Sequence, residues 1–172
     1  MKINPKVQDV LNKQINAEFW SAYLYLSMSI WFEGKGLKGF ANWMRVQYQE
    51  ETTHALKFLD FVSERQGTVK LEPIQQVPTE WSSILKVMET VYEHELLVTE
   101  LIYNCQETAE NEKDRATANM LQWFVNEQIE EEANVDMLIN QINLIGENGQ
   151  AIYLLDKELG NRVFTDPTAL AK

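Results

Sequence analysis

Apolar residues recur at steps of three and four along four long stretches of the chain, which is the spacing of one face of an α-helix. Glycine and proline gather between these stretches, where they end one helix and begin the next. Pro5 suits the start of the first helix, Gly67 is the expected cap after the second, and Ser82 is the expected N-cap of the third. The predicted helices cover about residues 6–33, 37–66, 82–111 and 114–145, with a short fifth helix at 150–159.

The connections between the predicted helices differ in length. Those near Gly36 and Lys113 are short, so each should join antiparallel neighbours, whereas the link from Gly67 to Glu80 is longer than a helical hairpin needs. One long link can carry the chain back along a bundle. Alternation of period two occurs only within this link, so we predict an all-α fold. The expected architecture is a single domain, residues 1–172, built as a four-helix bundle with one crossover.

Each apolar stripe is interrupted by polar residues about half-way along its helix. In the second helix the stripe reads Phe40, Met44, Gln47, Glu51, His54, Phe58 and Phe61. Glu95 interrupts the third helix, and Glu18 and Tyr25 interrupt the first. The fourth helix carries Gln128 and Glu131 at the same level. Because every interruption is central, the polar groups should meet at one level of the bundle.

Buried carboxylates without a cation cost several kcal/mol and repel one another. The central stripe positions hold no lysine or arginine, so a metal is the expected counter-charge. The set nearly matches the di-iron bundle pattern of single glutamates plus two Glu-x-x-His motifs. Glu51–His54 is a complete motif, but the other helix offers Gln128 and Glu131 in its place. Such ligands suit iron(II) or manganese and could admit zinc, in a two-metal site with one imidazole.

Other chemically notable residues have two readings. Tyr25 is either a core tyrosine or a hydrogen-bonding or redox neighbour of the metals. His94 points about 100° away from the stripe that carries Glu95, so we expect it at the surface or behind the ligands. The single cysteine, Cys105, excludes a disulfide framework and a thiolate cluster within one chain. We expect it to be a buried core residue in a reducing compartment.

The net charge of the chain and the length of its longest uncharged run indicate whether nucleic acid or a membrane is an expected partner. The net charge of −11 disfavours binding to nucleic acid and should attract cations. The uncharged run Phe19–Phe32 is shorter than the roughly 20 residues that cross a bilayer, and no signal for secretion is visible at the start. We therefore expect a cytoplasmic protein without a membrane span.

These residues resemble those of a bacterial non-haem ferritin, a member of the ferritin-like superfamily, over essentially the whole chain. The segments that carry the resemblance are Asn16–Phe19, Gln49–His54, Tyr92–Glu95, Gln122–Glu132 and Tyr153–Leu159. The resemblance implies a ferroxidase centre in which Glu18, Glu51 and His54 hold one iron. It implies that Glu51, Glu95 and Glu131 hold the second iron, with Gln128 beside it and Tyr25 nearby.

The resemblance also implies a third iron site formed by Glu50, Glu127, Glu130 and Glu131. The alternative for Glu50, Glu127 and Glu130 is a solvated acidic patch. Haem is not expected, because Thr52 stands where a bacterioferritin has its methionine ligand. A rubrerythrin is also excluded, because it needs pairs of cysteines.

The function that the resemblance implies is iron storage and detoxification. Iron(II) would be oxidised by dioxygen or hydrogen peroxide and kept as ferric oxyhydroxide inside a hollow 24-mer cage. The residues themselves predict only an oligomer, because the first helix is also apolar at Trp20, Tyr23, Leu24, Ile30 and Trp31. Two alternatives are a di-metal oxygenase or peroxidase and a structural acidic bundle that binds a protein.

Overall fold

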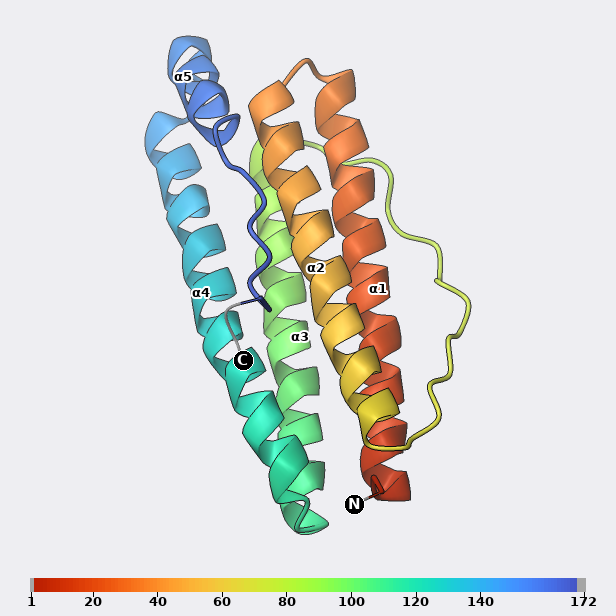
Figure 1. Cartoon of the computed structure of the whole chain (residues 1–172). Helices are drawn as coiled ribbons and strands as arrows, with labels where there is room; N and C mark the ends of the chain where they lie inside the picture. The colour runs from red at the N-terminus through yellow and green to blue at the C-terminus, as the bar shows by residue number, and fades with distance from the viewer. Residues whose placement is uncertain (1, 170–172) are drawn as a thin grey trace.

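The computed structural model describes residues 2–169, which form five helices and no strands. The helices are α1 (Pro5–Gly34), α2 (Lys38–Glu64), α3 (Ile84–Asn111), α4 (Arg115–Ile145) and α5 (Gly149–Leu159). α1 and α2 form one antiparallel pair, and α3 and α4 form a second (Figure 1). Residues 65–83 connect the two pairs and run along the outside of the bundle beside α1. The predicted all-α bundle with one long crossover is confirmed.

Two of the predicted helix ends are wrong in detail. The N-cap of α3 is Ser83 rather than Ser82, because the Ser83 side chain accepts a hydrogen bond from the Lys86 amide at 3.0 Å. After α2 the left-handed residue is Gln66, with φ 57°, and not Gly67. Gly67 is instead required by space, because a Cβ atom there would lie 2.8 Å from the Val62 side chain.

Asparagine side chains of α1 hold the crossover in place. Asn12 accepts a hydrogen bond from the Lys70 amide at 2.7 Å and donates one to the Thr68 carbonyl at 3.0 Å. Asn16 makes the equivalent pair with the Glu72 amide and the Lys70 carbonyl, at 2.7 and 2.9 Å. These backbone groups of the crossover are therefore satisfied by side chains of α1 rather than by a second strand.

The short helix α5 docks on the start of α2 and supplies its cap. Leu37, the N-cap residue of α2, makes no side-chain cap. Instead the Asp156 carboxylate accepts hydrogen bonds from the amides of Gly39 and Phe40, at 2.8 and 3.0 Å. Gly39 has no room for a side chain, since a Cβ atom would overlap the Asp156 carbonyl. An acidic group here also complements the helix dipole.

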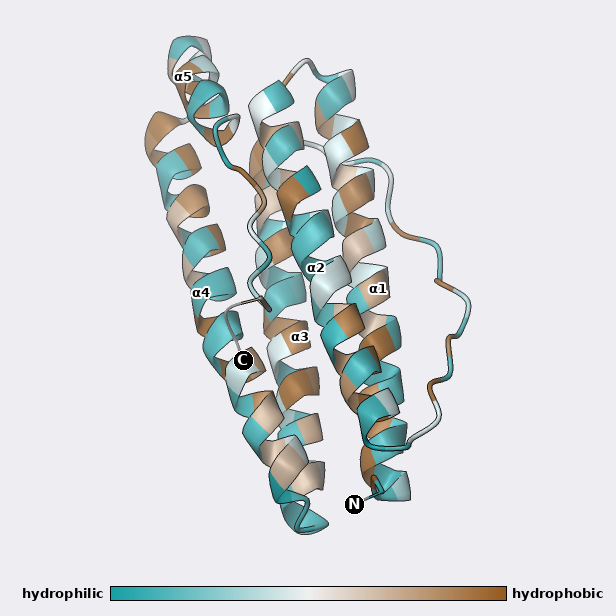
Figure 2. Ribbon diagram, in the orientation of Figure 1, coloured by the Kyte–Doolittle hydropathy of each residue, from teal (hydrophilic) through white to brown (hydrophobic). Residues whose placement is uncertain are grey.

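The core is divided into two apolar clusters by a polar layer. One cluster includes Met28, Phe32, Phe40, Met44, Met88 and Leu138. The other includes Leu11, Ile15, Phe58, Ile102, Leu121 and Phe124. Figure 2 shows apolar and hydrophilic residues mixed along every helix of the bundle, as amphipathic packing requires. Within residues 2–169 no helix combines the length and the apolarity needed to cross a membrane.

Candidate metal centre

The polar layer is made by six side chains from all four long helices, each no more than 4% exposed. They are Glu18 on α1, Glu51 and His54 on α2, Glu95 on α3, and Gln128 and Glu131 on α4. All six are residues that the interrupted stripes singled out. A polar residue at a position of the apolar stripe lies in the core of the bundle. Because all four long helices carry such residues at the same level, they enclose a polar pocket within an otherwise apolar bundle.

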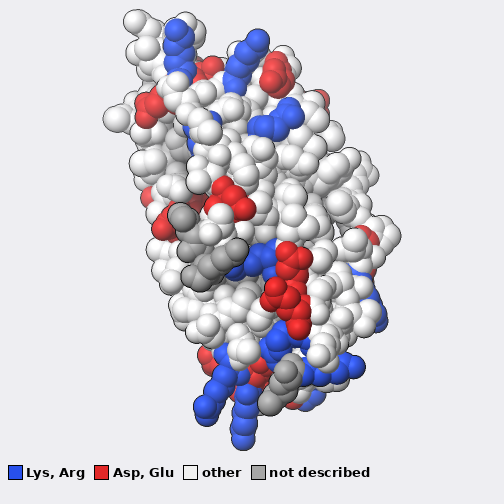
Figure 3. Space-filling view, in the orientation of Figure 1, with Lys and Arg blue, Asp and Glu red and all other residues white. Residues whose placement is uncertain are grey.

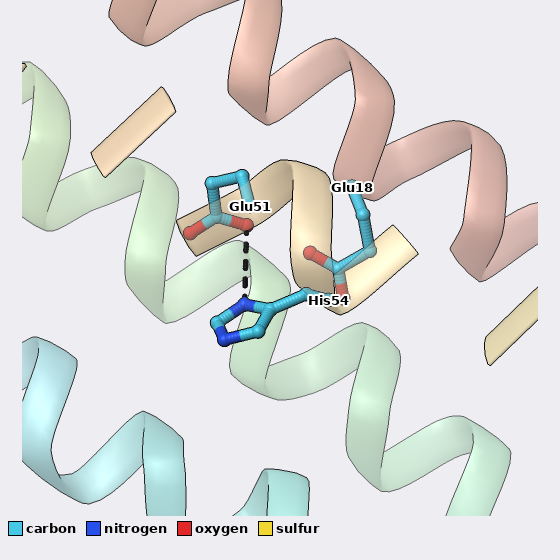
Figure 4. Close-up of side chains that lie close together, drawn as sticks. All are labelled: Glu18, Glu51 and His54. Atoms are coloured by element: carbon cyan, nitrogen blue, oxygen red, sulfur yellow. Dashed lines mark ion pairs between the residues drawn. The ribbon is translucent and has the colours of Figure 1, made fainter. Parts of the chain in front are cut away.

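Glu18, Glu51 and His54 form the tightest group of this layer. Their ligand atoms all lie within 4.8 Å of one another, and the side chains point toward each other from α1 and α2 (Figure 4). The Nδ1 atom of His54 is 3.6 Å from Oε2 of Glu51. The spacing of three residues on α2 places these two groups on one face.

Three atoms of this group are buried without a hydrogen-bond partner: Oε2 of Glu18, Oε2 of Glu51 and Nε2 of His54. Buried polar atoms are normally paired, because an unpaired one loses its hydration without compensation. The unpaired oxygens of Glu18 and Glu51 belong to the group whose ligand atoms lie within 4.8 Å of one another, and His54 turns its Nδ1 atom toward Glu51, so one cation would satisfy this group together. The donor set of two carboxylates and one imidazole suits iron(II), manganese or zinc.

Glu95 is held from two sides. The hydroxyl of Tyr25 donates to its Oε1, and the amide of Gln128 donates to its Oε2 at 3.1 Å. The same Gln128 amide nitrogen is 3.2 Å from the Thr99 hydroxyl. Tyr25 is fully buried, so the structure supports both earlier readings of it as a core residue and as a hydrogen-bonding neighbour.

Two further glutamines hold the remaining carboxylates. Gln14 donates from Nε2 to Oε1 of Glu18 at 2.8 Å. Gln47 donates from Nε2 to Oε2 of Glu131, also at 2.8 Å. Both glutamines are buried, with 2% and 0% exposure. Each donor fixes one carboxylate oxygen, and these fixed orientations preorganise the layer for a cation.

Burial dominates the electrostatics of the layer. Desolvation raises the pKa of Glu18 and Glu51 well above the usual range, and the charge of a neighbouring glutamate adds to each shift. Burial and the nearby Glu131 raise the pKa of Glu95 to about 8. Without metal these carboxyl groups therefore retain protons at neutral pH, and a bound cation would displace them.

This protonation predicts how the stability of the metal-free protein depends on pH. The pKa of Glu95 is about 8 when folded and near 4.5 in an unfolded chain. Between these values the folded state keeps a proton that the unfolded state releases, so the free energy of unfolding falls as pH rises. Calorimetry of metal-free protein should show a lower Tm at pH 8.5 than at pH 6. Glu95→Gln should flatten this slope, and an unchanged slope would contradict the assignment.

The residues expected at a third site lie on one side of this layer. Glu50 and Glu127 are half-buried and Glu130 is exposed. Oε1 of Glu127 lies 4.0 Å from Nε2 of His54. Burial raises the pKa of Glu50 to about 7. Oε2 of Glu50 also accepts a hydrogen bond from Arg162 at 2.7 Å.

Several contributors to the site were missed from the sequence. Gln14 lies four residues before Glu18 on the same helix face, and Gln47 is part of the α2 stripe, so both could have been predicted from the spacing of polar residues. No pattern in the sequence indicates Thr99 or Arg162. The absence of lysine and arginine from the central stripe positions is correct, but Arg162 reaches Glu50 from the segment after α5.

His94 and Cys105 lie outside the layer. Nε2 of His94 is 2.8 Å from the hydroxyl of Ser21, and burial lowers the pKa of His94 to about 4. Its ring also lies edge-on to Tyr25, 6.0 Å between centroids, so it packs behind the ligands. Cys105 is buried, as expected, and burial raises its pKa to about 12.

Residues 8–145 match the family model described as a ferritin-like domain. The chain belongs to the ferritin family. The resemblance predicted from its motifs is thereby confirmed. All six residues of the polar layer fall inside the matched range, whereas α5 and the segment after it lie outside that range.

Named ferritins align with nearly the whole chain. A bacterial non-heme ferritin of Bacteroides fragilis is 44% identical over 160 residues, which cover 93% of this chain and 99% of the relative. A probable bacterial non-heme ferritin-like protein of Haemophilus influenzae is 37% identical over 159 residues, 92% and 96% of the two chains. The open pore ferritin of the archaeon Archaeoglobus fulgidus superposes with a TM-score of 0.92 at 55% identity, covering 94% of this chain and 98% of that one. This ferritin chain therefore has the bundle of the family from end to end.

Proposed function

We propose that this chain oxidises iron(II) at the buried polar layer and stores the product as ferric oxyhydroxide. Iron storage follows from membership in the ferritin family. The single observation that carries the oxidation site is the convergence of Glu18, Glu51 and His54, three buried side chains whose ligand atoms lie within 4.8 Å of one another. Iron is here the substrate and the stored cargo.

The proposed chemistry transfers one electron from each of two iron(II) ions to an oxidant. With dioxygen, two iron(II) and two protons give two iron(III) and one hydrogen peroxide. With hydrogen peroxide as oxidant, the same iron and protons give two iron(III) and two waters. Hard carboxylate oxygens favour the more highly charged product, which lowers the free energy of the oxidised pair.

In this proposal, different residues of the chain bind the different iron ions. Glu18, Glu51 and His54 bind one ion, and Glu51, Glu95 and Glu131 bind the second. Gln128 lies beside this second position and holds Glu95. Protons held by the buried carboxyl groups leave as the cations enter. Glu50, Glu127, Glu130 and Glu131 are proposed to bind a third iron next to this pair.

Assembly into a hollow 24-mer cage is part of the same proposal. Exposed apolar side chains on α1 support an interface, since Tyr23 is 50% and Ile30 is 62% exposed. On the crossover, Leu71 is 65% exposed. Single apolar residues are common on surfaces, but a helix that is apolar on its outer side is typical of an oligomer. We further propose a cytoplasmic location and no nucleic-acid partner.

Stepwise aerobic addition of iron(II) to metal-free protein tests this function. We expect rapid oxidation and hundreds of irons retained in each native particle. Saturation at two or three irons per chain would replace storage with an oxidase or oxygenase role. No specific binding would leave only a structural bundle. The readouts are the absorbance of iron(III) and the iron content of the particle after gel filtration.

A further inference from the structure

The segment after α5 turns back along the bundle and lies against α2 and α4 (Figure 1). Two hydrogen bonds from the side-chain amide of Asn42 hold its beginning, to the carbonyl of Leu159 at 3.2 Å and to that of Arg162 at 2.9 Å. Figure 3 views this face, where Lys and Arg side chains stand directly beside Asp and Glu side chains. The segment therefore has a fixed path beside the metal centre.

Arg162 contacts three residues of α2. Its Nη1 atom donates to Oε1 of Gln47 at 2.5 Å, and its Nη2 atom donates to Oε2 of Glu50 at 2.7 Å. The guanidinium carbon lies 4.8 Å from the centre of the Trp43 ring. The Glu50 side chain is only 14% exposed and that of Arg162 is 24% exposed. A charge pair this shielded from water is much less screened than a surface pair.

The same contacts reach the polar layer through Gln47. Because Oε1 of Gln47 accepts from Arg162, its Nε2 must face the other way, toward Glu131. Gln47 is fully buried, so its amide cannot exchange these partners for water. Arg162 is therefore connected to a carboxylate of the metal centre as well as to Glu50.

We propose that Arg162 is a resident cation that gates the third metal position. While its guanidinium holds Glu50, a metal ion cannot share that carboxylate without facing a positive charge a few ångströms away. Arginine stays protonated at every working pH, so the block is removed only when the side chain moves. Iron enters the position formed by Glu50, Glu127, Glu130 and Glu131 only after Arg162 has left. This inference rests on the proposed function.

Zinc titration of metal-free, full-length protein tests the gate, because zinc binds such ligands without being oxidised. Isothermal calorimetry should show two tight cations per chain in the unchanged protein and in Arg162→Gln. A third cation should bind at least 10-fold more tightly in Arg162→Gln. Arg162→Lys keeps the charge and should stay close to the unchanged protein. Arg45→Gln, which removes an exposed charge from α2, the helix that carries Glu50, is the matched control.

A double variant locates the third cation. Adding Glu50→Gln to Arg162→Gln should abolish the gain, because the released carboxylate is then missing. A third cation that persists in the double variant overturns the proposal. Equal third-cation affinity with and without Arg162 also overturns it, while the two tight cations keep the proposed function intact. If the unchanged protein does not bind two tight cations per chain, the proposed function is overturned, and the proposed gate is overturned with it.

Discussion

Substituting Glu51 with glutamine should slow the oxidation of iron(II) by at least about 100-fold, since even a residue behind the metal ligands changes affinity or activity by about 10–100-fold. In the proposed centre Glu51 binds both ions, and its pKa responds to Glu95 as well as to Glu18. Glutamine keeps the shape but loses the charge that a pair of cations would share. Stopped-flow absorbance with two iron(II) ions per chain measures the rate.

The fold of this variant should survive. Burial already raises the pKa of Glu51, so the metal-free protein holds it largely protonated, and an amide is a close neutral substitute. We therefore expect the Tm of metal-free Glu51→Gln to match that of the unchanged protein, while the rise in Tm on adding metal is lost. Glu64→Gln, at an exposed position on the same helix, is the control and should oxidise iron normally. Normal oxidation by Glu51→Gln would remove it from the centre.

The bundle and its polar layer could be predicted because the spacing of apolar and polar residues along each helix indicates both. A stripe of step three and four defines a helix face, and one polar residue at its centre defines the level where that face changes. Glu18, Glu95 and Glu131 stand out for this reason, although they are far apart in the sequence. The comparison of levels needs only the helix lengths, which the glycines and prolines indicate.

The contacts of the C-terminal region could not be predicted in this way. Asp156 caps α2 from 117 residues away, and Arg162 reaches Glu50 from 112 residues away. Neither residue belongs to a periodic stripe that faces its partner, so no pattern along the chain connects them. The predictions of Ser82 as the N-cap of α3 and of Gly67 as the cap after α2 are wrong for a related reason. Residue type favours several neighbouring positions, and tertiary contacts, such as that of Gly67 with Val62, select one.

Substituting Gly39 with alanine should detach α5 and lower the free energy of unfolding by about 3 kcal/mol, the upper end of the usual cost of an added methyl group in a packed interior. The new Cβ atom would overlap the Asp156 carbonyl, which is rigid backbone and cannot rotate away. The displaced Asp156 would also uncap α2, because its carboxylate holds the Gly39 and Phe40 amides. Calorimetry gives the loss of stability, and hydrogen exchange of the α5 amides shows where it occurs.

Helix propensity sharpens this test, because it predicts the opposite sign. Alanine favours a helix over glycine by about 1 kcal/mol, so a loss of stability at Gly39 must come from the contact with α5. Gly34→Ala is the matched control: Gly34 also lies at a helix end, and nothing within 4 Å would meet its Cβ atom. It should leave the stability unchanged or slightly raised. Rapid α5 exchange in both variants, or in neither, would contradict the close docking of α5, and with it the fixed position of the segment that carries Arg162.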